Sequence, residues 1–317
     1  MQTEGDRVVA GDAFREAVSP TIDAVRALVD EIESVDERHG ALPDVKSQAM
    51  AEIAADSDWG QRSDWDNPLR DTHSFGAMTL VAARDYARAF AQTLDTDATP
   101  VYAHMVVARS ALEASVVSAW LNQPGIEVAE RVRRGLCEQL YSAMELVRLK
   151  LEDDARERVE RWKAIAMDLG WTAITNRSKP VVESTTRPSV PRGIDELIVG
   201  DGKWSLGRVE WSFLSALSHV TWYGLRQALP ESAPDDLTGM ATVAYGTSSR
   251  SVLVQALCVM RALRRTATRR FVLVGWEDEG WERASRAAAH HELGLLRAHV
   301  SAGAAARPGG SGSTAGT

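Results

Sequence analysis

One segment of the chain places two opposite charges on the apolar stripe of a predicted helix. Residues 102–121 read YAHMVVARSALEASVVSAWL, and at about 100° per residue one side of this helix is apolar. Arg109 and Glu113 fall on the centre of that side, at the i, i+4 spacing that allows an ion pair. Because the other side carries small or neutral residues, we expect the helix to be buried all round and the pair to lie in a helical core. Desolvation costs several kcal/mol per ion, so the pair indicates a pocket, a water-filled cleft or a specificity device.

A second helix carries a polar and aromatic face. Residues 206–229 read LGRVEWSFLSALSHVTWYGLRQAL. One face is apolar, and the opposite face is centred on His219, with Arg208, Ser212, Ser215, Trp222, Tyr223 and Arg226 around it. In one interpretation His219 is a buried histidine that bonds a carboxylate or a carbonyl. In the other, this face and the Arg109/Glu113 stripe line one pocket, with His219 as acid, base or ligand anchor, since histidine titrates near neutral pH.

The second interpretation defines the candidate site. Its catalytic candidates are His219, Glu113 and Arg109, with Glu113 orienting His219. The pocket candidates are Ser212, Ser215, Trp222, Tyr223, Arg226 and Trp120. The ten tryptophans, against five phenylalanines, favour a partly wet cavity, because a buried indole N–H needs a partner.

Composition restricts the class of protein. The chain has 317 residues and a net charge of −8, which argues against a broad electrostatic grip on nucleic acid without excluding a local one. Cys137 and Cys258 lie in helical patterns and are expected to be reduced, buried thiols. No apolar run approaches the roughly 18 residues of a membrane span, and the first residues lack a signal-type apolar core. We therefore expect a cytoplasmic protein with no membrane partner.

Nearly every periodic segment has the helical period, which predicts an all-α fold with no strand. We expect an N-terminal helical section and loop over 1–72, a helical bundle over 73–300 and a disordered tail over 301–317. Residues 56–72 and 172–202 read as loops, the second with a short helix near 194–199. The expected helices span 12–38, 43–55, 74–94, 102–121, 127–150, 152–169, 206–229, 249–274 and 276–299, and those at 127–150 and 152–169 could form one bent rod.

Two short motifs carry a family resemblance. RSALEASVVSAWL at 109–121 and WSFLSALSH at 211–219 resemble HEPN-type helical domains and, more narrowly, helical proteins of actinobacteria with an LS…H helix. The resemblance implies a helical bundle that self-associates, and endoribonuclease activity in defence or toxin–antitoxin systems. The family's catalytic motif is an arginine, four to six residues, then a histidine. Here the nearest arginine before His219 is Arg208, eleven residues away, so the standard ribonuclease pair is missing.

Two charged motifs are weaker signals. Asp153, Asp154 and Glu157 form a DDxxE spacing that could hold Mg²⁺ for terpene-synthase-like diphosphate chemistry, but no second ligand cluster accompanies it. A basic run on residues 249–274 is expected to be a solvated face that pairs with acids; it comprises Arg261, Arg264, Arg265, Arg269 and Arg270. The sequence therefore predicts no metal ion and no cofactor.

Three functions remain open at this point. The first is a binding or regulatory HEPN-like protein, linked to defence or toxin–antitoxin systems, without the ribonuclease pair. The second is a small-molecule enzyme of actinobacterial metabolism that uses Glu113 and His219 for acid–base chemistry. The third is the Mg²⁺-dependent diphosphate chemistry. Expected partners are a second copy of the chain and a small-molecule ligand.

Overall fold

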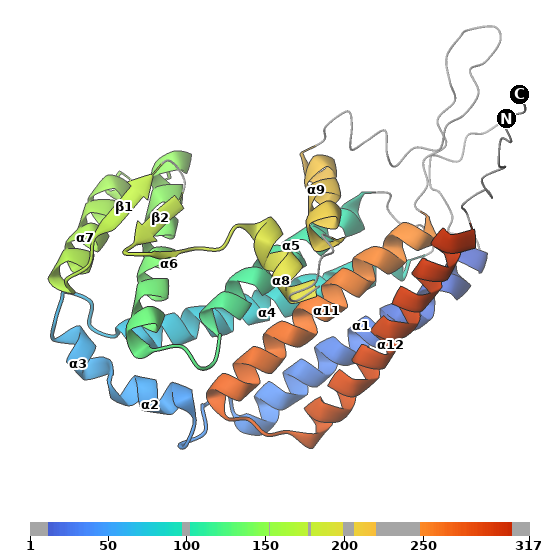
Figure 1. Cartoon of the computed structure of the whole chain (residues 1–317), viewed down its shortest axis with the longest axis horizontal. Helices are drawn as coiled ribbons and strands as arrows, with labels where there is room; N and C mark the ends of the chain where they lie inside the picture. The colour runs from blue at the N-terminus through green and yellow to red at the C-terminus, as the bar shows by residue number, and fades with distance from the viewer. Residues whose placement is uncertain are drawn as a thin grey trace, which may run out of the picture.

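The computed structural model describes residues 12–96, 102–151, 153–176, 179–198, 206–219 and 248–305. Over these ranges the chain is helical apart from one small sheet, which confirms the predicted all-α class. The long helices pack side by side in one bundle (Figure 1): α1 (Asp12–His39), α4 (Pro68–Leu94), α5 (Ala103–Leu121), α11 (Ser249–Val274) and α12 (Glu279–Ala305). Their inward faces form the main hydrophobic core.

Helix α5 is inserted in the bundle through its small residues. It packs closely on α4 and α11, and its buried side includes Ala108, Ala111 and Ser115. One close approach is at Gly76 of α4, where a Cβ atom would lie 2.7 Å from Asn122 Oδ1. The absence of a side chain at Gly76 lets Asn122 and Ser118 donate hydrogen bonds to its carbonyl, at 2.8 and 3.0 Å. The core also buries Met105, Leu112 and Val116, so that α5 is left partly exposed mainly around Val106, Arg109 and Glu113.

A second, smaller part of the molecule has its own hydrophobic core. Helices α6 (Val128–Leu149) and α7 (Ala155–Asp168) pack against each other and against the sheet. Short helices α2 (Gln48–Ala54) and α3 (Asp56–Gly60) run between this part and the bundle (Figure 1). The second core includes Trp65, Leu69, Leu136, Cys137, Ile165 and Val182.

The expectation of no strand was wrong, because the predicted loop over 172–202 contains a three-stranded antiparallel sheet. Its strands β1 (Ala173–Asn176), β2 (Lys179–Val182) and β3 (Thr185–Thr186) are in the order β1-β2-β3. They are too short to show alternation of polar and apolar residues. Pro180, in the central strand, pairs only with Thr175 of β1, so the proline's missing N–H leaves the β2–β3 ladder intact.

A strap of residues 187–189 joins this sheet to the bundle, and Figure 1 shows it crossing between the two parts. The strap enters α8 (Val190–Ile198), which starts before the short helix expected there and packs on α11 and α9 (Leu206–Ser218). Gly193 lets α8 approach α5, because a Cβ atom there would overlap Val116. Helix α8 therefore packs directly on α5.

Several predicted boundaries were also wrong. The loop expected over 56–72 is shorter, because α3 and the start of α4 occupy its two ends. Helices α6 and α7 do not form one rod: Lys150 has a left-handed conformation, with φ at 54°, and the chain turns back there. Helix α12 extends to Ala305, into the expected tail, and residues 306–317 lie outside the described residues.

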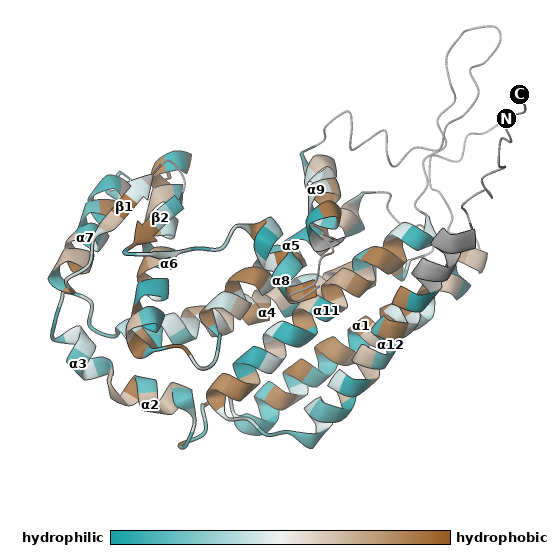
Figure 2. Ribbon diagram, viewed as in Figure 1, coloured by the Kyte–Doolittle hydropathy of each residue, from teal (hydrophilic) through white to brown (hydrophobic). Residues whose placement is uncertain are grey.

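Figure 2 shows hydrophilic and hydrophobic residues interspersed along the bundle helices. Consistent with this pattern, no helix in the described ranges is long and apolar enough to cross a membrane.

Candidate functional site

Four polar and aromatic side chains from α5 and α9 meet where these helices pack together; we call them the Glu113 cluster. Arg109 Nε donates to Glu113 Oε1 at 2.7 Å, and Trp211 Nε1 donates to the same oxygen at 3.1 Å. The Arg109 guanidinium lies 5.5 Å from the centre of the Trp211 ring, within the range of a cation–π contact. Its Nη1 lies 3.4 Å from His219 Nε2. The structure thus brings together the three catalytic candidates of the sequence, with Trp211 added.

The links within the Glu113 cluster differ from the expectation. Glu113 does not orient His219, because in the described chain its hydrogen bonds go to Arg109 and Trp211. Arg109 lies between them and can only donate hydrogen bonds. The contact of His219 is therefore with the guanidinium of Arg109, at 3.4 Å, and not with a carboxylate.

The prediction that Arg109 and Glu113 lie inside a helical core was also wrong. Their side chains are 18% and 36% exposed, and Val106, on the same stripe, is 43% exposed. Both sides of α5 are buried along most of its length, since Met105, Leu112 and Val116 of the stripe lie in the main core. The exposed part of the stripe is the stretch around Val106, Arg109 and Glu113.

Glu113 lines a cavity of about 520 Å³, which we call the Glu113 cleft. Its walls come from both parts of the molecule: Phe75, Thr79 and Tyr86 of α4, Ser110, Glu113, Ala114 and Val117 of α5, Tyr141 of α6, Lys179 and Pro180 of β2, Arg187, Pro188 and Ser189 of the strap, Val190 and Pro191 of α8, and Trp211 of α9. In the described chain Glu113 Oε2 has no hydrogen bond, so one carboxylate oxygen is available to a ligand. The volume of the Glu113 cleft is within the range of small-molecule sites.

The other predicted pocket residues are dispersed. Ser212 is exposed and its hydroxyl donates to Arg208 O at 2.8 Å, within its own helix. Ser215 is half-buried on α9 and does not line the Glu113 cleft. Trp120 lines a different cavity, on the other side of the strap. Trp222, Tyr223 and Arg226 lie outside the described residues.

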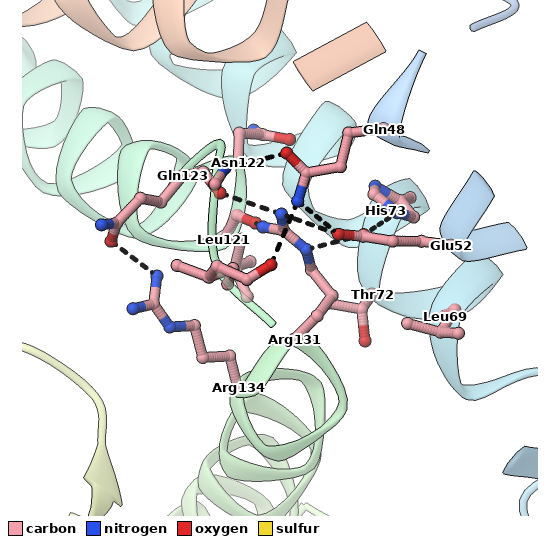
Figure 3. Close-up of polar contacts among 12 residues, drawn as sticks. Gln48, Glu52, Leu69, Thr72, His73, Leu121, Asn122, Gln123, Arg131 and Arg134 are labelled. Carbon is pink, nitrogen blue, oxygen red and sulfur yellow. Dashed lines mark hydrogen bonds and ion pairs between the residues drawn. The ribbon is translucent and has the colours of Figure 1, made fainter. Parts of the chain in front are cut away.

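A second polar cluster, which the sequence did not reveal, lies between α2, α4 and α6 (Figure 3). Arg131, which is fully buried, donates from Nε to Glu52 Oε2 at 3.0 Å and from Nη2 to Gln123 O at 2.9 Å. Its Nη1 donates to Leu121 O. Glu52 Oε2 also lies 2.8 Å from His73 Nε2, and Gln48 Nε2 donates to Glu52 Oε1 at 2.7 Å. We call this set the Glu52 network.

Burial controls the electrostatics of the Glu52 network. Burial opposes the ionisation of Glu52, but its contacts with His73 and Arg131 outweigh that effect and lower its pKa. Burial lowers the pKa of His73, against the effect of Glu52. Glu52 is therefore an anion beside a neutral histidine and a guanidinium. No local spacing could have indicated this pair, since Glu52 and Arg131 are 79 residues apart.

The two weaker charged motifs lie on α7 and α11. Asp154 accepts a hydrogen bond from Arg158 Nε at 3.2 Å on the surface of α7. Among the described residues, no group of three His, Cys, Asp or Glu side chains could hold a metal ion. The basic run of α11 is not a solvated face: Arg264 forms a two-bond ion pair with Glu292, and Arg270 is 6% exposed, with its pKa lowered to about 10 by burial.

No protein-family model matches this chain, and no curated protein or solved structure is significantly similar to it.

Proposed function

We propose that this chain is a HEPN-like helical protein that acts by binding a small molecule in the Glu113 cleft, without the ribonuclease chemistry of the family. The observation that carries the proposal is the arrangement of Glu113. One of its oxygens is fixed by Arg109 and Trp211, while the other has no hydrogen bond in the described chain and lines a cavity of about 520 Å³. A carboxylate fixed in this way is a preorganised acceptor for a ligand N–H or O–H.

The chemistry of the Glu113 cluster favours binding over acid–base catalysis. An acid–base pair needs two groups that exchange a proton with the substrate. Here Arg109 lies between Glu113 and His219 and holds its charge at all physiological pH values. The resemblance of 109–121 and 211–219 to HEPN-type domains supports a regulatory role linked to defence or toxin–antitoxin systems, with self-association.

A ligand screen read at Trp211 tests this proposal. Each tryptophan gives one indole N–H signal by NMR, and the Trp211→Phe variant assigns that of Trp211. We expect a ligand of the cleft to shift this signal and to bind at least about tenfold more weakly to Glu113→Gln, the weight of one hydrogen bond to a charged group. Ligands that leave the Trp211 signal unchanged, or that bind Glu113→Gln equally well, would contradict the proposal. Light scattering on the same samples measures self-association.

The alternative is a small-molecule enzyme, and the size of the Glu113 cleft is the observation that favours it. Proton spectra recorded during the same screen distinguish the two functions. A binding protein returns its ligand unchanged, whereas an enzyme converts it. If Glu113 or His219 acts as an acid or base, folded Glu113→Gln or His219→Ala loses about 10² or more in rate.

A further inference from the structure

Five cationic side chains from five different elements line a single cavity beside the strap, opposite the Glu113 cleft. The cavity has a volume of about 420 Å³. We call it the arginine cavity and define it by Arg134 of α6, Lys179 of β2, Arg187 of the strap, Arg192 of α8 and Arg269 of α11. In a solvated helix face, the cationic side chains would all come from one helix. Here they come from five elements, and the tertiary fold brings them together.

Carboxylates compensate only part of this charge. Three of the cations are paired: Arg134 Nε donates to Glu130 Oε1 at 2.9 Å, Arg187 Nε lies 3.1 Å from Glu138 Oε1, and Arg269 Nη2 donates to Glu196 Oε1 at 3.4 Å. Of the three acids, only Glu196 lines the cavity. Five cations against three carboxylates leave a positive cavity in a chain whose net charge is −8.

Lys179 and Arg192 carry the uncompensated charge. Both are exposed, and neither side chain has a hydrogen bond or ion pair with another residue of the described chain. Arg187 is in a different state: its side chain is 21% exposed and its guanidinium lies 3.9 Å from the centre of the Tyr141 ring. Arg187 is thus held in place, while Lys179 and Arg192 are free to close on a bound group.

Glu138, the partner of Arg187, cancels only part of the positive charge of that arginine. Burial raises the pKa of Glu138 to about 7, although Arg187 acts to lower it. At neutral pH this carboxyl is therefore only partly ionised, and it balances only part of the charge of Arg187. The first turn of α8 adds a contribution of the same sign, because Ser189, Arg192 and Gly193 line the cavity and a helix N-terminus carries a partial positive charge.

We propose that the arginine cavity binds the phosphate group of a small molecule, with Arg187 as the fixed donor and Lys179 and Arg192 closing on the anion. The planar guanidinium matches the geometry of phosphate oxygens. A compact ligand is favoured over a polymer, because the cations converge on one cavity of about 420 Å³, whereas a nucleic acid needs an extended basic face. The site goes beyond the proposed function: it borders the Glu113 cleft at Lys179 and Arg187 and does not use Glu113.

Calorimetric titration of the full chain with inorganic phosphate and with pyrophosphate, at constant ionic strength, tests this site. The test variant is Lys179→Gln/Arg192→Gln, whose two residues are exposed and unpaired in the described chain. The control is Arg283→Gln/Arg286→Gln on α12, whose side chains are 69% and 70% exposed. Both change the net charge by the same amount. We expect affinity for pyrophosphate to fall about a hundredfold in the test variant, about tenfold per charge-assisted hydrogen bond, and less than about twofold in the control.

Three results would overturn the site. One is no heat of binding with either anion at millimolar concentration. The second is equal weakening in the two variants, which would show a general ionic effect. The third is binding of a short RNA that the test variant loses, with no binding of pyrophosphate. Glu113→Gln separates the two proposals, because it weakens ligands of the Glu113 cleft and leaves pyrophosphate binding unchanged.

Discussion

Two glutamate–arginine pairs in this molecule have the same chemistry and opposite surroundings. Glu52 and Arg131 are 3% and 0% exposed, and Arg131 is further bonded to the carbonyls of Leu121 and Gln123. Arg109 and Glu113 are 18% and 36% exposed, and Glu113 lines a cavity. The first pair fixes the ends of α5 and α6 against α2. The second has an unused carboxylate oxygen that a ligand could reach.

The difference in burial and hydrogen bonding between the two pairs distinguishes polar groups that stabilise the fold from polar groups that can bind a ligand. Burying a charge is unfavourable unless hydrogen bonds compensate it, and in the Glu52 network several do. Both oxygens of Glu52 accept hydrogen bonds, which leaves this carboxylate no free oxygen for a ligand. Glu113, in contrast, has one oxygen without a hydrogen bond in the described chain. Substitutions in the two pairs should therefore differ in their effect on stability.

Glu52→Gln should have the largest effect. It leaves the guanidinium of Arg131 buried without its counter-charge, and breaking a buried pair in this way costs about 3–5 kcal/mol of stability. Urea unfolding measures the loss. The matched control is Glu52→Leu/Arg131→Met, which removes both charges and should be less destabilised than Glu52→Gln. A loss of stability below about 1 kcal/mol in Glu52→Gln is typical of an exposed ion pair and would show that solvent reaches the Glu52 network.

Glu210 provides a buried carboxyl with no counter-charge. It is 9% exposed, its Oε1 has no hydrogen-bond partner within the described ranges, and burial raises its pKa to about 7 from 4.5. The folded protein therefore retains a proton that the unfolded chain releases between these values. Stability is fully present below pH 4.5 and falls as the pH rises to about 7, by on the order of 1–3 kcal/mol.

Glu210→Gln should remove this pH dependence. Unfolding in urea at pH values from 4.5 to 8 measures it, and we expect the variant to be more stable than the wild type at pH 8 and similar to it at pH 4.5. Burial also raises the pKa of Glu138 to about 7. The free energy of unfolding of Glu210→Gln should therefore still fall with rising pH, but less than that of the wild type. Identical pH profiles for wild type and Glu210→Gln would show that this carboxyl is solvated.

Glu113→Gln should have a small effect on stability. The pair with Arg109 is partly exposed and lies within one helix, so its loss costs about 1 kcal/mol or less. Gln keeps an acceptor for Trp211 Nε1, which preserves that bond. The same urea measurement applies, and Glu52→Gln is the internal comparison. A loss as large as that of Glu52→Gln would show that the Glu113 cluster is a structural element and would contradict the proposed ligand site.

The sequence predicted the local features and missed the long-range ones. Arg109 and Glu113 were found because an i, i+4 spacing is visible in one helix. The approach of His219 was one of two interpretations of the polar face over 206–229, and no spacing in the sequence showed that the two helices are neighbours. The pairing of Glu52 with Arg131 depends on the packing of α2 against α6, which no periodicity encodes. The arginine cavity is hidden for the same reason. Strands of four, four and two residues were missed because they are shorter than the alternation that identifies a strand.

His219→Ala should have the smallest effect on stability, within about 0.5 kcal/mol, because the ring is exposed and its contact with Arg109 is long, at 3.4 Å. The variant has a second use. Since the arginine that the HEPN motif requires is absent from the sequence, the wild type and His219→Ala should both leave RNA intact in a gel assay. Cleavage by the wild type that His219→Ala abolishes would mean that Arg109, from another helix, supplies the missing group. The Glu113 cluster would then be a catalytic pair assembled by the fold, and its open carboxylate would serve the reaction instead of a stored ligand.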